Sequence, residues 1–466
     1  MKDKESFRVE TDSMGDVKVP GGAYWGAQTQ RAVENFSVSD LRIPVPLVRA
    51  LGLVKQVAAI VNGELGLLEP RIAEAVGRAA AEMAEGKWDA HFPIDVFQTG
   101  SGTSWNMNAN EVIANRANEL LGSPLGAKKP VHPNDHVNRG QSSNDVIPTV
   151  INIADRMQLD RCASALDALR QSLARKAAEF ANVLKIGRTH LQDAVPMTLG
   201  QEFSGYTRQV EKARELLLRC APGLEELAIG GTAIGTGINT HPDFARRVTA
   251  AIARLTRLPF RSAANLFEAI AARDSQVELA GALNSISVCL TKIANDLRLL
   301  SSGPRTGLAE ISLPSLQPGS SIMPGKVNPV ILEMTIQAAA RVMGSCLTIS
   351  IAGTTGPLEL NMMQPLLAWE SLSSLSLMET TCRALAERCV EGITANVARS
   401  REWIEQSLAL VTPLALKVGY DRAAKLAQKA LAENRTIRDV VIAEGILSAE
   451  EADKILDPGT MLGPHE

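Results

Sequence analysis

One run of apolar residues constrains the fold of this chain more than any other feature. Between Leu279 and Leu300, large aliphatic residues recur at alternating gaps of four and three, at positions 279, 283, 286, 290, 293, 297 and 300. That spacing predicts a long helix that packs against other long helices. Small residues fill most of the positions between them, so more than one face of the helix can be covered. We therefore expect this helix at the centre of a bundle.

The rest of the chain fits a mostly α-helical protein of three domains. Only 4% of its residues are aromatic, and Ala and Leu dominate, which favours helix over sheet. Residues 1–141 form a mixed, mainly helical domain, residues 142–396 a central domain of long helices, and residues 397–466 a small domain of short helices and turns. Further long helices are predicted over 330–352 and after Pro365. Such apolar helices predict a homo-oligomer whose subunits pack bundle to bundle.

Charge and cysteine usage limit the possible partners. A net charge of −3 gives no electrostatic case for binding nucleic acid or an anionic membrane. No charge-free run reaches the ~18 apolar residues of a membrane span, and residues 1–6 lack the apolar core of a signal peptide. The six cysteines are dispersed without metal-ligand spacing. We therefore predict a cytoplasmic protein with reduced thiols and no metal.

The segment Gly319-Ser-Ser-Ile-Met-Pro-Gly-Lys-Val-Asn-Pro329 is the strongest candidate for a binding site. Asn328 suits a helix N-cap and Pro329 the first helical position. The segment should then deliver its polar groups to a helix N-terminus, where N–H groups and the dipole favour a carboxylate. A plain Ser/Gly-rich linker is the alternative. A phosphate-binding P-loop is excluded, because five residues separate the glycines and Val327 follows the lysine.

Three further segments share this polar composition. They are Thr99–Glu111, Gln141–Asp145 and Gly187–Asp193, and the last of them precedes Thr198-Leu-Gly-Gln201, which has the spacing of a capping box. Each segment alone could be an ordinary helix cap. Together they would line one polar pocket if the fold brings them together. The stretch Gly230–Gly237 lacks a dinucleotide fingerprint and is typical of a close-packed turn, so we expect no cofactor.

His190 is the titrating group that we expect in such a pocket, because imidazole changes charge near neutral pH. Glu333, one turn into the helix predicted after Pro329, could orient and charge it as a carboxylate does in a catalytic triad. A lone histidine is more often an ordinary surface or core group, so both interpretations stand. The turn His132-Pro-Asn-Asp135 could hold a small anion or be an ordinary turn.

The four polar segments together resemble conserved regions of the fumarase/aspartase superfamily, and most closely those of class II (iron-independent) fumarases. The segment 319–329 matches the superfamily signature, and the resemblance runs from about residue 7 to the C-terminus. It implies a three-domain subunit with a long central helix bundle that assembles into a homotetramer. It also implies that loops of three different subunits form each active site.

The resemblance further implies reversible anti elimination of water from (S)-malate to give fumarate, through an aci-carboxylate carbanion and without a cofactor. Ser320 would remove the C3 proton, and His190, paired with Glu333, would handle the proton on the leaving-hydroxyl side. The implied substrate-binding residues are Ser101, Thr103, Ser142, Ser143, Asn144, Thr189, Ser321, Lys326 and Asn328. A second dicarboxylate site is implied at Lys129, His132, Pro133, Asn134 and Asp135.

Some residues depart from the fumarase pattern. Ser104-Trp105 stands where fumarases usually carry smaller polar residues, which would place a bulky ring beside the substrate loop. Thr240–Asp243 resembles aspartase-like relatives, whereas Ser142–Asn144, Pro324–Lys326 and Gly419–Ala424 resemble fumarases. The balance favours a fumarase. An aspartate ammonia-lyase or related fumarate-releasing lyase is the alternative, and a non-catalytic structural protein of the same fold is a third hypothesis.

Overall fold

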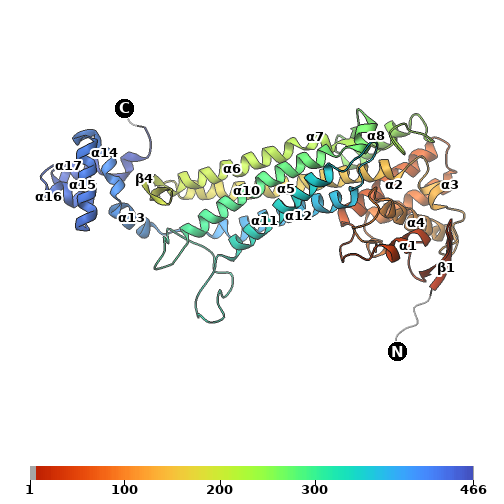
Figure 1. Cartoon of the computed structure of the whole chain (residues 1–466), viewed down its shortest axis with the longest axis horizontal. Coiled ribbons are helices and arrows are strands. Elements are labelled where there is room, and N and C mark those ends of the chain that lie inside the picture. Colours follow the sequence, from red (N-terminus) through yellow and green to blue (C-terminus); the bar gives the residue numbers. More distant parts are fainter. Residues whose placement is uncertain (1–6, 465–466) are drawn as a thin grey trace. The chain divides into compact units, whose positions relative to one another are not determined.

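The computed structural model describes residues 7–464 (Figure 1). Helices account for 62% of the residues, which confirms the prediction of a mostly α-helical fold. Residues 1–6, on which the inference about a signal peptide depends, lie outside the described residues.

The chain divides into two compact units. Unit 1 comprises residues 1–163, 215–285 and 341–378, and unit 2 comprises residues 164–214, 286–340 and 379–466. Because the boundaries of these units fall within long helices, those helices contribute residues to both. The three domains predicted from composition, with boundaries at 141/142 and 396/397, stay a prediction.

Unit 1 opens with an antiparallel hairpin of β1 (Phe7–Asp12) and β2 (Gly15–Pro20). Its apolar core is built largely by α2 (Val45–Glu64), α3 (Pro70–Ala84) and α4 (Thr103–Leu120), of which α3 packs against both others (Figure 1). The shorter elements of this unit are α1 (Ala27–Asn35), η1 (Asp89–His91), η2 (Pro133–Val137), α7 (Ala221–Leu224), the parallel strands β5 (Glu226–Leu227) and β6 (Arg261–Ser262), α8 (Phe244–Thr256) and α9 (Leu266–Ala271).

Four long helices provide the bundle that the sequence predicts. They are α5 (Ser143–Glu179), α10 (Asp274–Leu300), α11 (Val330–Gly353) and α12 (Gln364–Arg388). All seven aliphatic residues of the repeat in α10 are at most 5% exposed, so the prediction of a helix buried along that seam is confirmed. The helices predicted over 330–352 and after Pro365 are confirmed as α11 and α12.

Unit 2 contains the antiparallel hairpin of β3 (Leu184–Thr189) and β4 (Gln192–Thr198), and α6 (Leu199–Arg219). Short helices follow Asn396, as predicted, and they bury an apolar cluster of their own. The remaining elements are the antiparallel strands β7 (Ile311–Ser312) and β8 (Thr394–Ala395), η3 (Val390–Gly392), α13 (Val397–Gln406), η4 (Leu408–Leu410), α14 (Val411–Val418), α15 (Tyr420–Glu433), α16 (Ile437–Ala443), α17 (Ala449–Ile455) and η5 (Pro458–Met461).

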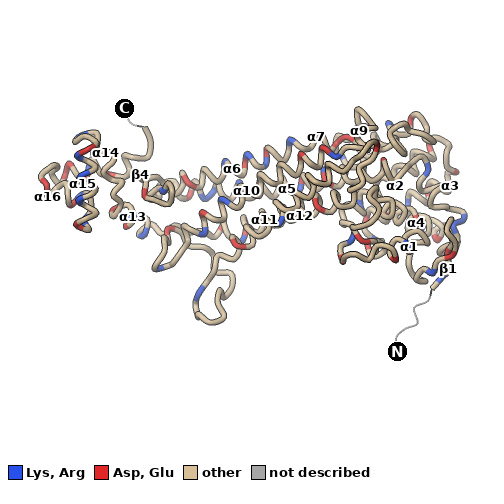
Figure 2. The backbone as a smooth tube through the Cα atoms, viewed as in Figure 1, with Lys and Arg blue, Asp and Glu red and all other residues tan. Residues whose placement is uncertain are grey.

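Within residues 7–464, three helices are long and apolar enough to cross a membrane by length and composition: α2, α10 and α11. Each carries charged residues, so a search for charge-free runs does not find them. In α2, 67% of the most apolar window is buried inside the protein, whereas in α11 only 39% is buried. Figure 2 shows Lys and Arg interspersed with Asp and Glu along the described chain, in keeping with its small net charge.

The packing of α10 can be tested at Leu290, whose side chain is fully buried. Leu290→Ala should lower the free energy of unfolding by about 2–5 kcal/mol, because it removes buried methyl groups and leaves a cavity. Leu431 on α15 is 70% exposed, so Leu431→Ala is the matched control and should change the free energy by less than ~0.5 kcal/mol. Denaturant titrations at one protein concentration measure both. Equal effects would contradict the described packing of α10.

Candidate active site

The segment around Ser101 forms a tight turn at the start of α4. Gly102 has a φ of +70°, a conformation that glycine adopts without strain. A Cβ at Gly100 would overlap the carbonyl oxygen of Met362, and Gly100 O accepts a hydrogen bond from Gln364 N at 2.9 Å. Ser101 Oγ and Thr103 Oγ1 are 2.9 Å apart, so the two hydroxyls lie together at the N-terminus of α4.

The segment Gln141–Asp145 leads into the first turn of α5, which begins at Ser143, and the buried carboxylate of Asp145 organises it. Its carboxylate accepts hydrogen bonds from Ser142 N at 2.9 Å, Gly230 N at 3.0 Å and Thr232 N at 2.9 Å. Complete burial raises the pKa of Asp145 to about 6, although these donors oppose the rise. Asp145 therefore ties the polar turn to the tight glycine turn at Gly230, which confirms the interpretation of Gly230–Gly237 as a close-packed turn.

The fold brings these two polar segments together in unit 1. Asn106 Nδ2 on α4 donates to Ser143 Oγ at 3.0 Å. Ser143 is buried, so its hydroxyl joins the two segments, whereas Ser142 and Asn144 are only partly buried. The side chain of Asn144 is held by a 2.8 Å hydrogen bond from its Nδ2 to Ala233 O.

Trp105 does not form a wall of this site. Its side chain has no exposed surface and belongs to the apolar core of unit 1. The expectation that its ring would lie beside the substrate loop is therefore wrong. On a helix, residues 103 and 105 are roughly 200° apart, so α4 can present Thr103 to the site while the indole packs inward.

In unit 2, His190 lies at the tip of the β3–β4 hairpin. Thr189 pairs with Gln192, so His190 and Leu191 form a two-residue turn, and both have positive φ (55° and 60°). His190 and Thr189 are exposed. A non-glycine residue in this conformation is uncommon, and such residues concentrate at functional sites.

Strand β3 of this hairpin is anchored by a buried carboxylate. Glu310 is fully buried, and its Oε1 accepts a 2.9 Å hydrogen bond from Arg188 Nη1. Lys185 Nζ lies 3.4 Å from the other oxygen of Glu310 and 3.0 Å from Glu202. At the open end of the hairpin, away from the tip, Thr198 and Gln201 form the predicted capping box, with hydrogen bonds of 2.9 and 3.0 Å. The hairpin therefore has a fixed base and an exposed tip.

The segment 319–329 is a loop whose two ends are held together. Gly319 N donates to Lys326 O at 2.7 Å, and Asn328 Nδ2 donates to Gly319 O at 2.7 Å. The prediction that Asn328 caps the helix is wrong: α11 begins at Val330, and the Asn328 amide closes the loop instead. Within the loop, Ser320 Oγ accepts hydrogen bonds from Ile322 N at 3.2 Å and Met323 N at 2.9 Å.

Two charged groups predicted for the site, Lys326 and Glu333, are accessible. Lys326 is exposed, and Glu333, in the first turn of α11, is partly exposed. Among residues 7–464 of this single chain, no hydrogen bond or ion pair links His190 to Glu333 or to Ser320. Ser321 is exposed on the same loop.

Three of the five residues predicted for a second dicarboxylate site, Lys129, His132 and Asp135, line an open cavity of about 610 Å³ in unit 1, whereas Pro133 and Asn134 do not line it. Asn134 N and Asp135 N both lie 3.3 Å from His132 Nδ1, which places the ring proton on Nε2. Asp135 Oδ2 is 3.2 Å from the same Nδ1, a contact that is an ion pair only when the ring is protonated. Pro133 is buried and starts the short π-helix η2. The cavity is lined by Ser123, Lys128, Lys129, Pro130, His132, Asp135 and His136.

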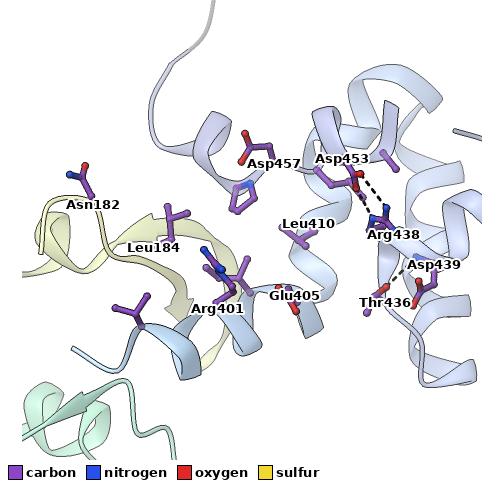
Figure 3. Close-up of a pocket in the computed structure, with 15 residues that line it drawn as sticks. Asn182, Leu184, Arg401, Glu405, Leu410, Thr436, Arg438, Asp439, Asp453 and Asp457 are labelled. Carbon is purple, nitrogen blue, oxygen red and sulfur yellow. Dashed lines mark hydrogen bonds and ion pairs between the residues drawn. The ribbon is translucent and has the colours of Figure 1, made fainter. Parts of the chain in front are cut away.

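A further cavity, of about 640 Å³, lies among β3, α13 and the C-terminal helices of unit 2 (Figure 3). Arg438 and Asp453 are paired on its wall at 2.6 Å, and Arg401 and Glu405 project from α13. None of the residues predicted to bind substrate lines it. In the described part of the chain, no group of three or more His, Cys, Asp and Glu side chains could hold a metal ion.

Sequence reasoning missed the buried groups that support these loops. The first such group is the carboxylate of Glu310. The second is the set of buried amide side chains around Asn106. A recognisable signal existed for the second group, since Asn106, Asn108 and Asn110 alternate through the first turns of a helix whose neighbouring residues are apolar. Buried amides in such a pattern indicate a hydrogen-bonded network.

The tight turn at Gly100 provides a test of this geometry. Gly100→Ala should lower the free energy of unfolding by roughly 1–3 kcal/mol, because its Cβ would meet a rigid backbone carbonyl. Gly22→Ala is the matched control, since no described atom lies within 4 Å of the Cβ it would add. Thermal unfolding compares the two. A Gly100→Ala variant as stable as Gly22→Ala would show that the turn is not packed in this way.

Comparison with known proteins agrees with this arrangement. A family model described as lyase matches residues 15–344, and one described as fumarase C C-terminus matches residues 410–463. The class II fumarate hydratase of Methylorubrum extorquens is 51% identical over 458 residues, which cover 98% of this chain and 97% of that protein. The mitochondrial fumarate hydratase of Rattus norvegicus is 50% identical over 467 residues, covering 100% of this chain and 92% of that protein.

The fold agrees with the sequence relationship. The crystal structure of class II fumarase from Schistosoma mansoni superposes with a TM-score of 0.95 at 40% sequence identity, and the match covers 99% of this chain and 100% of that one. Similarity of this degree extends over both units and both groups of polar loops. The chain therefore belongs to the lyase family of the fumarase/aspartase superfamily and, within it, to the class II fumarate hydratases.

Proposed function

We propose that this chain catalyses the reversible elimination of water from (S)-malate to give fumarate, and that Ser320 is the base of the reaction. Its class II relatives are named fumarate hydratases. The observation that carries the assignment of Ser320 is the pair of backbone N–H groups, from Ile322 and Met323, that donate to its Oγ. A free serine hydroxyl is too weakly acidic to act as an alkoxide base without such assistance.

The loop supplies the charge stabilisation that this role needs. Two N–H donors on one oxygen favour its anionic form, because hydrogen bonds to the charged state lower the pKa of a group. Lys326 carries a positive charge on the same loop, and its ammonium has no partner among the described residues. In the proposed reaction Ser320 removes the C3 proton, and negative charge then develops on the substrate carboxylate.

Preorganised donors would hold that developing charge. The aci-carboxylate carbanion carries two negative charges on one carboxylate, so donors aimed at those oxygens lower the barrier. The residues proposed for this role, and for binding the second carboxylate, are Ser101, Thr103, Ser142, Ser143, Asn144, Thr189, Ser321, Lys326 and Asn328. In this structure Ser143 and Asn328 already make hydrogen bonds within the protein, so we expect them to act partly by holding their loops.

His190 is proposed to handle the proton on the leaving-hydroxyl side, through a water molecule and with Glu333 as its carboxylate partner. The exposed, positive-φ turn that carries His190 supports this role. Because no hydrogen bond joins His190 to Glu333 among the described residues of one chain, we infer that the pair forms when subunits assemble. Each active site would then be shared by three subunits of a homotetramer.

Exposed apolar side chains on the long helices support this assembly. On α10, Val288 is 55% exposed, and on α11, Leu347 and Ile351 are 64% and 57% exposed. Large apolar side chains gathered on long helices of a water-soluble protein mark an interaction surface.

We also propose that the cavity at Lys129 and His132 binds a second dicarboxylate, which its lysines would attract. A cytoplasmic location stays a prediction.

The proposed chemistry can be tested at Ser320 and His190. Ser320→Ala and His190→Asn should each lower kcat by roughly 10²–10⁴-fold, because each removes a proton-transfer group. KM should change far less, since neither group is proposed to provide the main binding contacts. The ultraviolet absorbance of fumarate, followed with EDTA present, measures both constants. Ser315→Ala, an exposed serine of the same connection, is the control and should behave like the unmodified chain.

The outcomes discriminate between the hypotheses. Near-normal kcat in either variant would contradict the role given to that residue. Release of fumarate from aspartate, with no turnover of malate, would show that the chain is an ammonia lyase. A folded tetramer without turnover of either substrate would favour a structural protein.

The assembly can be tested with a charge on the exposed face of α11. Leu347→Glu should dissociate the tetramer and abolish activity, because it would bury an unpaired carboxylate in the subunit interface. Leu416 on α14 is 94% exposed, so Leu416→Glu is the control and should leave the assembly intact. Size-exclusion chromatography with light scattering measures the mass of each. An intact, active tetramer of Leu347→Glu would exclude this face from the interface.

A further inference from the structure

Lys55 is a completely buried charged residue to which the proposed reaction assigns no role. It lies on α2, between apolar neighbours of the unit 1 core. Burying an ammonium group is costly unless hydrogen bonds replace those it made with water. Burial lowers the pKa of Lys55 to about 7, and the negative charge of Asp145 opposes that change. The hydrogen-bond partners of Lys55 should therefore show why an ammonium group is buried here.

Those partners are two amide side chains of the turn before α5. Lys55 Nζ donates to Asn138 Oδ1 at 2.9 Å and to Gln141 Oε1 at 3.0 Å. An ammonium group has donors only, so both amide oxygens must face it and both amide NH₂ groups must point away. Lys55 therefore determines which way each amide is turned.

The orientation of these amides fixes the backbone of the turn. Asn138 Nδ2 donates to Gln141 O at 3.1 Å. Gln141 Nε2 donates to Val137 O at 3.1 Å and to Arg139 O at 3.2 Å. If either amide rotated by half a turn, an oxygen would face these carbonyl groups and the hydrogen bonds would be lost. The turn leads directly into Ser142, so its backbone sets where the polar segment begins.

The same network reaches the other polar segment of unit 1. Asn138 Oδ1, which accepts from Lys55, also accepts from Asn106 Nδ2 at 3.3 Å and from Asn110 Nδ2 at 3.2 Å. Asn106 Nδ2 is also the donor to Ser143 Oγ. One amide oxygen beside Lys55 thus connects the first turns of α4 to the first turn of α5.

We propose that Lys55 is a positioning residue for substrate binding. By orienting the amides of Asn138 and Gln141, it holds Ser142, Ser143 and Asn144 where they bind a carboxylate of the substrate, without touching the substrate itself. This inference rests on the proposed function, because it assumes that the 142–144 segment contacts the dicarboxylate.

The test compares two substitutions of Lys55 by their effect on binding. Lys55→Met keeps the apolar stem but has no donor, and Lys55→Gln keeps an NH₂ donor without the charge. We expect Lys55→Met to weaken inhibition by succinate, an unreactive four-carbon dicarboxylate, by roughly 10- to 100-fold, the scale on which groups that position a binding residue affect a site. KM for malate should rise in parallel, with a smaller change in kcat. Lys55→Gln should recover a large part of the binding.

Structural damage alone would give a different pattern. Thermal unfolding and the mass of the assembly are measured on the same samples, and assays are run well below both melting temperatures. Lys87→Met, at an exposed lysine of the same unit, is the control and should leave succinate inhibition unchanged. If Lys55→Gln restores stability but not binding, or if folded Lys55→Met binds succinate normally, the positioning role is overturned.

Two further variants distinguish a failure of the role proposed for Lys55 from a failure of the proposed substrate site at residues 142–144. If Lys55→Met does not fold, Asn138→Asp tests the same link, because it keeps an oxygen towards Lys55 but removes the NH₂ that holds Gln141 O. It should weaken succinate inhibition, and normal inhibition would overturn the inference. Asn144→Ala tests the loop itself: if succinate inhibition is unchanged there, the proposed site is wrong. If Asn144→Ala weakens inhibition and folded Lys55→Met does not, only the role of Lys55 fails.

Discussion

Long apolar helices are stable in water only when their faces are covered, and the rest of this protein is arranged around that constraint. The seam of α10, from Leu279 to Leu300, is fully or almost fully buried, so it has no room for functional polar groups. The residues proposed to bind substrate lie instead in loops and first turns at the ends of helices, at the starts of α4, α5 and α11 and in the β3–β4 hairpin. Helix N-termini also supply the N–H groups that suit an anionic substrate.

Polar loops on an apolar framework need internal support, and buried charges provide it. Asp145 accepts three backbone N–H groups, and Glu310 anchors the hairpin that ends in His190. Lys55 orients the amides that lead into the α5 turn. The exposed side chains of His190 and Lys326 have no hydrogen-bond or ion-pair partner among the described residues, as the proposed roles in binding and proton transfer require.

The fold was largely predictable because periodicity is a local property. The alternating gaps that end at Leu300 predict a buried helix whatever the rest of the chain does, and the polar segments stand out by composition. Interactions between distant residues were not predictable. Asn328 does not cap α11, since the carbonyl of Gly319 competes for its amide. Trp105 could not be assigned to the core from its neighbours alone. The partner of His190 cannot be read from one chain if another subunit supplies it.

The central claim is that subunits share each active site, and mixing two impaired variants tests it directly. Asn144→Ala impairs the polar segments of unit 1, and Ser320→Ala removes the proposed base in unit 2. If different subunits contribute these groups to one site, tetramers assembled from both variants contain some sites with every wild-type residue. Dissociating and reassembling the mixture should then restore malate turnover well above that of either variant treated alone. A mixture no more active than the two separate variants, although mass measurements show hybrid tetramers, would contradict the account.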